Sequence, residues 1–188
     1  GAVLNIMGGT IKNGQSSSYG GNLGGWTCTI NIGGTALIEN GKAVHGGANL
    51  YIPNAPMTVN ITGGTLRGGE GKFGGNIYLV KNTNKGSLNI SGGIIENGKS
   101  TKSDEGGGNI FASEGASLNI TGGIIRNGEA ANVGGNIMSH NDIVLGGNAI
   151  VSGGKAKFGG NISVSKEYTL TIGENAQVLD GEATNAGG

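Results

Sequence analysis

The chain has 188 residues, of which 43 are glycine and two are proline, and its twelve basic and twelve acidic residues give a formal net charge of zero. The lack of a basic excess argues against a nucleic-acid groove, which needs one to displace counterions from phosphates. No apolar run reaches the roughly 18 residues of a membrane-spanning helix, and one cysteine with two histidines is too few ligands for a zinc cluster. We therefore expect no nucleic-acid partner, no membrane span in this segment, no metal and no cofactor.

A repeat of roughly 27 residues runs along the chain, marked by Gly-Gly-Asn-(Ile/Leu) or a close variant of it. A unit that returns in register is typical of a solenoid, in which each repeat buries its apolar face against its neighbours. The glycines fall at fixed offsets between apolar triplets, so they indicate corners and not disorder. The asparagine of the motif recurs at Asn22, Asn49, Asn76, Asn109, Asn136 and Asn161.

Each repeat contains three short segments that we predict to be β-strands. The first, such as Leu4-Asn5-Ile6, alternates aliphatic and polar residues and leads into a Gly-Gly corner. The second, such as Ile11-Lys12, ends in Asn-Gly, a dipeptide that tolerates positive φ and turns the chain sharply. The third follows Gly-Gly-Asn and reads, for example, Ile77-Tyr78-Leu79. Helices are not expected, because glycine interrupts every window with helical periodicity.

Parallel stacking of these segments gives an all-β solenoid with three short strands per coil and about seven coils, each rising about 4.8 Å. A hairpin at Asn-Gly is the alternative, but the segments on its two sides differ, and each type returns only after a full repeat. We expect residues 1–188 to form a single domain. Both ends of the sequence fall within a repeat, so we expect this domain to be a segment of a longer repeat protein.

Two columns of charged residues favour the same register. The residues before the Asn-Gly corners, and those just after them, alternate in sign from one repeat to the next. Stacked at one strand spacing, each charge would lie beside opposite charges. We interpret these charges as part of the scaffold. The columns are Lys12, Glu39, Arg67, Glu96 and Arg126, and Gln15, Lys42, Glu70, Lys99, Glu129, Lys155 and Glu182.

From Leu4 to Gly188 the chain resembles the right-handed parallel β-helices of the pectate-lyase-like superfamily. Its Gly-Gly-Asn-Ile repeats are similar to those of bacterial surface adhesins and autotransporter passengers of the polymorphic outer-membrane type. The resemblance implies a right-handed coil and a secreted or cell-surface bacterial location. It also implies that the corner asparagines form a stacked structural ladder, in which each amide bonds the next coil.

Enzymes with this fold need two or three acidic groups on one face of adjacent coils, or calcium-binding aspartates with a basic partner. The three aspartates, Asp104, Asp142 and Asp180, belong to different coils and sides. We interpret the pair Asp104-Glu105 and His140 as solvated loop residues. The sequence therefore favours a protein without enzymatic activity, and a polysaccharide lyase or glycosidase with active loops mostly outside this segment is the alternative.

The outward position of the third segment is the preferred candidate for a binding surface. Alternation points its side chains away from the core, and four of them, Tyr51, Tyr78, Phe111 and Met138, are large and apolar. An exposed apolar stripe favours partner binding, and aromatic rows suit sugar rings or protein side chains. We expect an adhesin-like module that binds a host protein or glycan there, with the loop of residues 99–105 at its rim. Mutual stacking in a purely structural stalk is the other interpretation.

One further column precedes the Gly-Gly-Asn corner. We interpret His45 as a packing residue there, because the equivalent positions of other coils hold Tyr19, Phe73, Val133 and Phe158.

Overall fold

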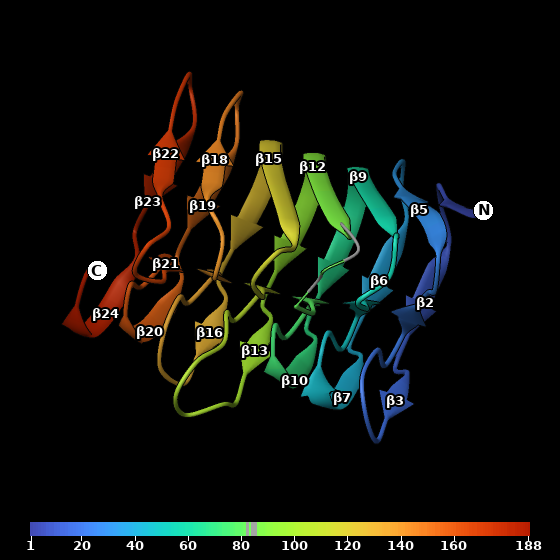
Figure 1. Ribbon diagram of the computed structural model, residues 1–188, viewed down its shortest axis with the longest axis horizontal. Coiled ribbons are helices and arrows are strands. Elements are labelled where there is room, and N and C mark those ends of the chain that lie inside the picture. The colour runs from blue at the N-terminus through green and yellow to red at the C-terminus, as the bar shows by residue number, and fades with distance from the viewer. Residues whose placement is uncertain (82, 84–85) are drawn as a thin grey trace.

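The computed structural model describes residues 1–81, 83 and 86–188. Within this part of the chain there is no helix, and successive coils pair through parallel strands to form three sheets (Figure 1). The coils follow one another in chain order from the N-terminus to the C-terminus, and each strand pairs with strands of the adjacent coils. The predicted all-β solenoid, with three strands per coil and about seven coils, is confirmed.

Sheet A has eleven strands and contains both the first and the second predicted segments. In three central coils these segments form one ten-residue strand, bent where Gly64, Gly93 and Gly123 have φ values of 76°, 82° and 83°. The Gly-Gly position is thus a bend within a strand there and not the predicted corner, because pairing resumes beyond it after a register shift. The strands are β1 (Ala2–Ile6), β2 (Thr10–Lys12), β5 (Cys28–Ile32), β6 (Leu37–Glu39), β9 (Thr58–Arg67), β12 (Ser87–Glu96), β15 (Ser117–Arg126), β18 (Ile143–Leu145), β19 (Ile150–Ser152), β22 (Leu170–Ile172) and β23 (Gln177–Leu179).

Sheet B has seven strands and follows the Asn-Gly turns, where the sequence predicts only a column of charges. Its strands are β3 (Gln15–Ser16), β7 (Lys42–Gly46), β10 (Glu70–Phe73), β13 (Lys99–Ser100), β16 (Glu129–Ala130), β20 (Lys155–Phe158) and β24 (Glu182–Ala186). Sheet C has six strands, which match the third predicted segment: β4 (Leu23–Gly24), β8 (Leu50–Ile52), β11 (Ile77–Leu79), β14 (Ile110–Ala112), β17 (Ile137–Ser139) and β21 (Ile162–Val164).

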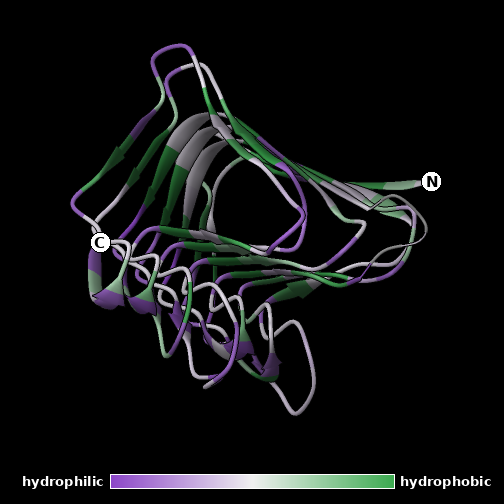
Figure 2. Ribbon diagram, turned by 60° about the vertical axis from the view of Figure 1, so that its left-hand side comes forward, coloured by the Kyte–Doolittle hydropathy of each residue, from purple (hydrophilic) through white to green (hydrophobic). Residues whose placement is uncertain are grey.

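The three sheets surround one core of stacked aliphatic side chains, and hydrophobic residues follow the strands of sheet A while hydrophilic ones follow sheet B (Figure 2). Ile30, Val59, Leu88 and Leu118 occupy one position in successive coils, and none is more than 3% exposed. Like residues in register at one strand spacing fill the interior without gaps. The repeat therefore encodes the core directly.

A buried asparagine ladder runs along the corner between sheets B and C, as the resemblance implies. The Nδ2 atom of each ladder asparagine donates to the Oδ1 atom of the next, at 2.6 to 2.8 Å, from Asn22 through Asn161. Each amide also joins the corner to the turn between sheets A and B, which is Asn-Gly in four coils and Gly-Gly in two. Asn109 accepts from the Gly98 amide at 2.8 Å and donates to the Arg126 carbonyl at 2.9 Å. Each coil is thereby fixed to its own turn and to the coils on both sides.

A second ladder lies on the outward face of sheet A. Asn5, Asn31, Asn60, Asn89 and Asn119 are linked by Nδ2–Oδ1 hydrogen bonds of 2.8 to 2.9 Å. Its amides are half-buried or exposed, whereas four amides of the corner ladder have no exposed surface. Strand alternation places them on this face, opposite the aliphatic residues of the same segment.

The charge columns have the predicted register. Each ion pair joins one basic residue to one glutamate of an adjacent coil, so the charges form separate pairs and not a continuous chain. Arg67 and Arg126 lie 2.7 and 2.8 Å from glutamate oxygens of the preceding coil. On sheet B the ammonium–carboxylate distances are 3.8, 3.5 and 2.9 Å for Lys42–Glu70, Lys99–Glu129 and Lys155–Glu182. The exposed lysine pairs of sheet B each contribute little to stability. Their value lies in disfavouring a shifted register, which would place like charges side by side.

Removal of a corner amide should destabilise the protein far more than removal of an amide from the outward ladder. Asn109→Ala leaves the buried Gly98 N–H without its partner, removes one of the two donors to the Arg126 carbonyl and breaks two ladder bonds, so we expect the free energy of unfolding to fall by about 2–4 kcal/mol. Asn89→Ala breaks two ladder bonds on the outer face and should cost less than about 1 kcal/mol. Urea unfolding of both variants measures the difference, and equal losses would contradict it.

Candidate functional site

The predicted binding stripe lies on the outward face of sheet C. Tyr51, Tyr78, Phe111 and Met138 pair in register along β8, β11, β14 and β17, as alternation predicts. The expected exposure is wrong for three of them, because Tyr78, Phe111 and Met138 are 8%, 3% and 6% exposed, and only Tyr51 is half-buried. They form a second hydrophobic cluster, outside the main core, which we call the aromatic cluster. Their role in binding remains a prediction.

The residues that cover the stripe come from the turn between sheets B and C. Phe73, at the end of β10, stacks on Tyr78 and Phe111 with ring centroids 5.3 and 5.1 Å apart. Tyr19 stacks on Tyr51 at 4.6 Å, and the predicted packing residue His45 lies 5.0 Å from Tyr19. The turn folds the residue before each Gly-Gly back over sheet C. The sequence contains this signal in the column of Tyr19, His45, Phe73, Val133 and Phe158. Three of these, Tyr19, Phe73 and Val133, pack against stripe residues.

The long loop of residues 101–109, between β13 and β14, extends along the same side of the solenoid (Figure 1). The Lys102 ammonium lies 4.3 Å from the centroid of the Phe73 ring, a cation–π contact. The same ammonium is 2.8 Å from the Glu105 carboxylate and 3.4 Å from that of Asp104. The predicted rim loop therefore reaches the aromatic residues through the contact between Lys102 and Phe73.

A pocket of about 200 Å³ opens at the surface of the aromatic cluster. Phe73, Tyr78 and Phe111 contribute its aromatic wall, and its polar lining comes from Lys81, Glu105, Ser113, Glu114 and His140. These residues belong to three coils, so no single repeat contains the site. The sequence predicts Glu105 and His140 to be separate solvated loop residues, but the structure brings them together in this pocket.

His140 is the least satisfied group of the pocket. Its ring packs edge-on against Phe111 at 5.5 Å, and its Nδ1 atom lies 3.2 Å from the Ser165 hydroxyl. Its Nε2 atom lies 3.2 Å from a Glu105 oxygen, but that approach lacks hydrogen-bond geometry and leaves Nε2 buried without a hydrogen-bond partner.

The remaining charges of the pocket are paired. The Lys81 ammonium lies 2.7 Å from the Glu114 carboxylate, and this contact lowers the pKa of Glu114 and raises that of Lys81. Both side chains are more than half exposed, so the pair is available to a ligand at modest desolvation cost.

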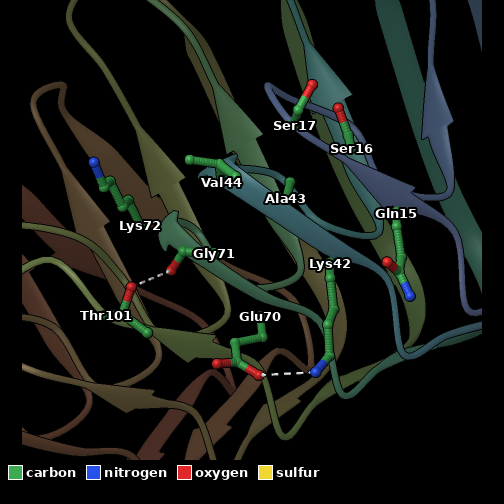
Figure 3. A pocket seen from close by; sticks show the side chains of 10 residues that line it. All are labelled: Gln15, Ser16, Ser17, Lys42, Ala43, Val44, Glu70, Gly71, Lys72 and Thr101. Carbon is green, nitrogen blue, oxygen red and sulfur yellow. Dashed lines mark hydrogen bonds and ion pairs between the residues drawn. The ribbon is translucent and has the colours of Figure 1, made fainter.

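A second concavity, a groove of about 520 Å³, crosses the outward face of sheet B over β3, β7 and β10 (Figure 3). Val44, which is 52% exposed, projects from its middle, and the Lys42–Glu70 pair lies on one side. No aromatic side chain lines this groove. The full lining is Gln15, Ser16, Ser17, Lys42, Ala43, Val44, Glu70, Gly71, Lys72 and Thr101.

Residues 1–81, 83 and 86–188 contain no candidate metal-ligand group and no candidate membrane-spanning helix. No three side chains of histidine, cysteine, aspartate or glutamate are grouped so that they could hold a metal ion. That part of the chain also holds no helix with the length and hydropathy needed to span a bilayer. Asp142 accepts a hydrogen bond from the Thr169 amide at 2.7 Å, and Asp104 lies in the 101–109 loop, so these aspartates do not converge on one site.

Comparison of the chain with protein-family models, with curated proteins and with solved structures gave no match.

Truncation of the aromatic cluster should destabilise the fold. Phe111 is 3% exposed and contacts Phe73, Tyr78 and His140, so Phe111→Ala should lower the free energy of unfolding by about 3 kcal/mol. Val44→Ala removes an exposed apolar side chain from the groove and should change it by less than about 0.5 kcal/mol. Chemical denaturation is the measurement, and a neutral Phe111→Ala would contradict the burial of the stripe.

Because the pKa of Tyr51 is raised in the folded protein, we expect the fold to lose stability at high pH. Burial, followed by the neighbouring Tyr19 and Tyr78, raises the pKa of Tyr51 to about 12, above an ordinary value near 10. The neutral phenol therefore stabilises the fold fully below about pH 10, and this contribution is lost as the pH rises towards 12. Titration by tyrosinate absorbance should show a step near 12 that Tyr51→Phe removes. An unchanged titration curve in this variant would contradict the assignment.

Proposed function

We propose that this protein is a non-enzymatic binding module of a secreted or cell-surface bacterial protein, similar to the right-handed β-helix adhesins of the pectate-lyase-like superfamily. Its partner is a host protein or glycan, with a glycan favoured by the chemistry of the pocket. The observation that carries the proposal is the pocket in which Glu105, His140 and the Lys81–Glu114 pair surround an aromatic wall.

A sugar unit fits this combination of groups. Sugar rings pair an apolar face with a periphery of hydroxyl groups, and small-ligand sites combine aromatic walls with a few convergent polar groups. The pocket is smaller than the roughly 300 Å³ and more of drug-sized sites, which suits one ring of a larger glycan. Its polar lining offers both donors and acceptors, namely the Lys81 ammonium, the Ser113 hydroxyl and the carboxylates of Glu105 and Glu114.

The state of the carboxylates favours binding over catalysis. A glycosidase general acid needs a raised pKa, so that it carries a proton at working pH. The ammonium of Lys81 instead lowers the pKa of Glu114, and Glu105 is in contact with Lys102 at 2.8 Å. Glu114 is therefore placed as a charged hydrogen-bond acceptor, and Glu105 already accepts a hydrogen bond from Lys102. A polysaccharide lyase or glycosidase remains the alternative function.

One observation favours a purely structural stalk as a further alternative. Tyr78, Phe111 and Met138 are covered by their own chain, and such burial stabilises a rod whether or not a ligand binds. A stalk would show no retention on any glycan or protein surface.

The pocket can be tested with two matched double variants. Lys81→Ala with Glu114→Ala removes the exposed ion pair of the pocket, and Lys42→Ala with Glu70→Ala removes an equally exposed pair from the sheet B groove. We expect the first to weaken retention on a glycan array about tenfold or more, since polar contacts to charged groups are lost, and the second to leave it unchanged. Thermal unfolding should stay within a few degrees for both.

Three results would contradict the proposal. Equal retention by both double variants would show that the pocket is not part of the binding face. Loss of retention in the Lys42–Glu70 variant alone would show that the ligand binds in the sheet B groove. Release of shortened or unsaturated sugar products by the native chain would replace binding with catalysis.

A further inference from the structure

The four Asn-Gly turns contain an intrinsically reactive sequence. In Asn-Gly the backbone nitrogen of glycine can attack the side-chain carbonyl carbon of asparagine, because glycine has no side chain to hinder the approach. A carbon–nitrogen bond forms, ammonia leaves, and the succinimide is opened by water to aspartate or isoaspartate. The turns are Asn13-Gly14, Asn40-Gly41, Asn97-Gly98 and Asn127-Gly128, and their asparagine side chains are exposed.

The attacking nitrogen is bound in every one of these turns. The N–H groups of Gly14, Gly41, Gly98 and Gly128 donate to the Oδ1 atoms of the corner asparagines at 2.7, 2.9, 2.8 and 2.9 Å. Loss of the amide proton must precede attack, and a buried hydrogen bond opposes it. The nitrogen is also shielded, because Gly41, Gly98 and Gly128 are buried.

The asparagine backbone is held as well. Asn13, Asn40, Asn97 and Asn127 have φ values of 59°, 54°, 54° and 54°, the left-handed conformation that Asn-Gly turns favour. Their amides donate to carbonyl groups of the next coil at 3.0 to 3.1 Å. Rotation that would bring the glycine nitrogen against the asparagine side chain therefore requires local opening of the turn.

We propose that these four asparagines are latent deamidation sites, which the buried ladder keeps unreactive by binding the glycine N–H. The ladder then has a chemical as well as a structural role. Each deamidation adds a carboxylate beside a charge column, as at Asn97, which follows Glu96. If the product is isoaspartate, the main chain between β12 and β13 also gains one carbon atom. Either product disturbs the register that the ladder maintains.

The equivalent turns of two other coils offer inert counterparts. Gly69 and Gly154 make the same bond, to Asn76 at 3.0 Å and Asn161 at 2.9 Å, but each follows a glycine and has no side chain to attack. Asn97→Gly therefore copies a turn that the solenoid already contains, and it removes one site.

Peptide mapping after incubation at mildly alkaline pH tests the proposal. In denaturant all four asparagines should deamidate, whereas the folded chain should react at least about 100-fold more slowly at each, because reaction needs local opening. Asn109→Ala frees the Gly98 N–H and should accelerate Asn97 about tenfold or more over Asn127, whose Gly128 keeps its bond to Asn136. Asn97→Gly confirms the assignment of the modified peptide.

Asn89→Ala serves as the control, because its amide belongs to the outward ladder and binds no turn glycine. It should leave all four rates unchanged. Folded-state rates within about tenfold of the unfolded rates would overturn the proposal, as would equal acceleration of all four sites in Asn109→Ala. If that variant does not fold, the comparison of folded and unfolded chains still decides the question.

Discussion

The buried amide at the corner between sheets B and C is the interaction on which the rest of the solenoid depends. Asn76, for example, bonds two neighbouring ladder amides, the Gly69 N–H and the Glu96 carbonyl. A buried primary amide has two donors and two acceptor sites, and here all four are used. The same side chain therefore closes its own turn and sets the height of the next coil. Register, turn geometry and coil spacing are thus fixed by one residue per repeat.

The repeat makes most of this fold predictable from the sequence. Identical residues return in identical environments, so the core positions and the charge columns follow from the spacing of the motif, whereas the ladder is what the family resemblance implies. Two features depend on tertiary geometry and do not follow from it. Gly64, Gly93 and Gly123 bend a continuous strand instead of ending it, because parallel pairing on both sides outweighs the turn preference of Gly-Gly. The strands of sheet B could not be predicted from the sequence, because they are short and about half of their residues are polar.

The binding stripe shows the limit of alternation as a guide to exposure. Alternation places Tyr78 and Phe111 on the outer side of sheet C, and they lie there. It says nothing of Phe73, which reaches over them from the preceding turn. The pocket depends on that cover and on the 101–109 loop, an insertion into one coil. Its polar groups, Glu105 and His140, are therefore the least repetitive residues nearby, and no column of the repeat points to them.

Native-state hydrogen exchange of the turn glycines tests the central role of the ladder most directly. If the corner amides hold the coils together, the N–H groups of Gly41, Gly98 and Gly128 should be protected from exchange as strongly as the buried strand amides of sheet A. Exchange of these glycines at the rate of ordinary exposed turns, while the sheet amides stay protected, would show that the corners open independently and that the ladder does not carry the fold.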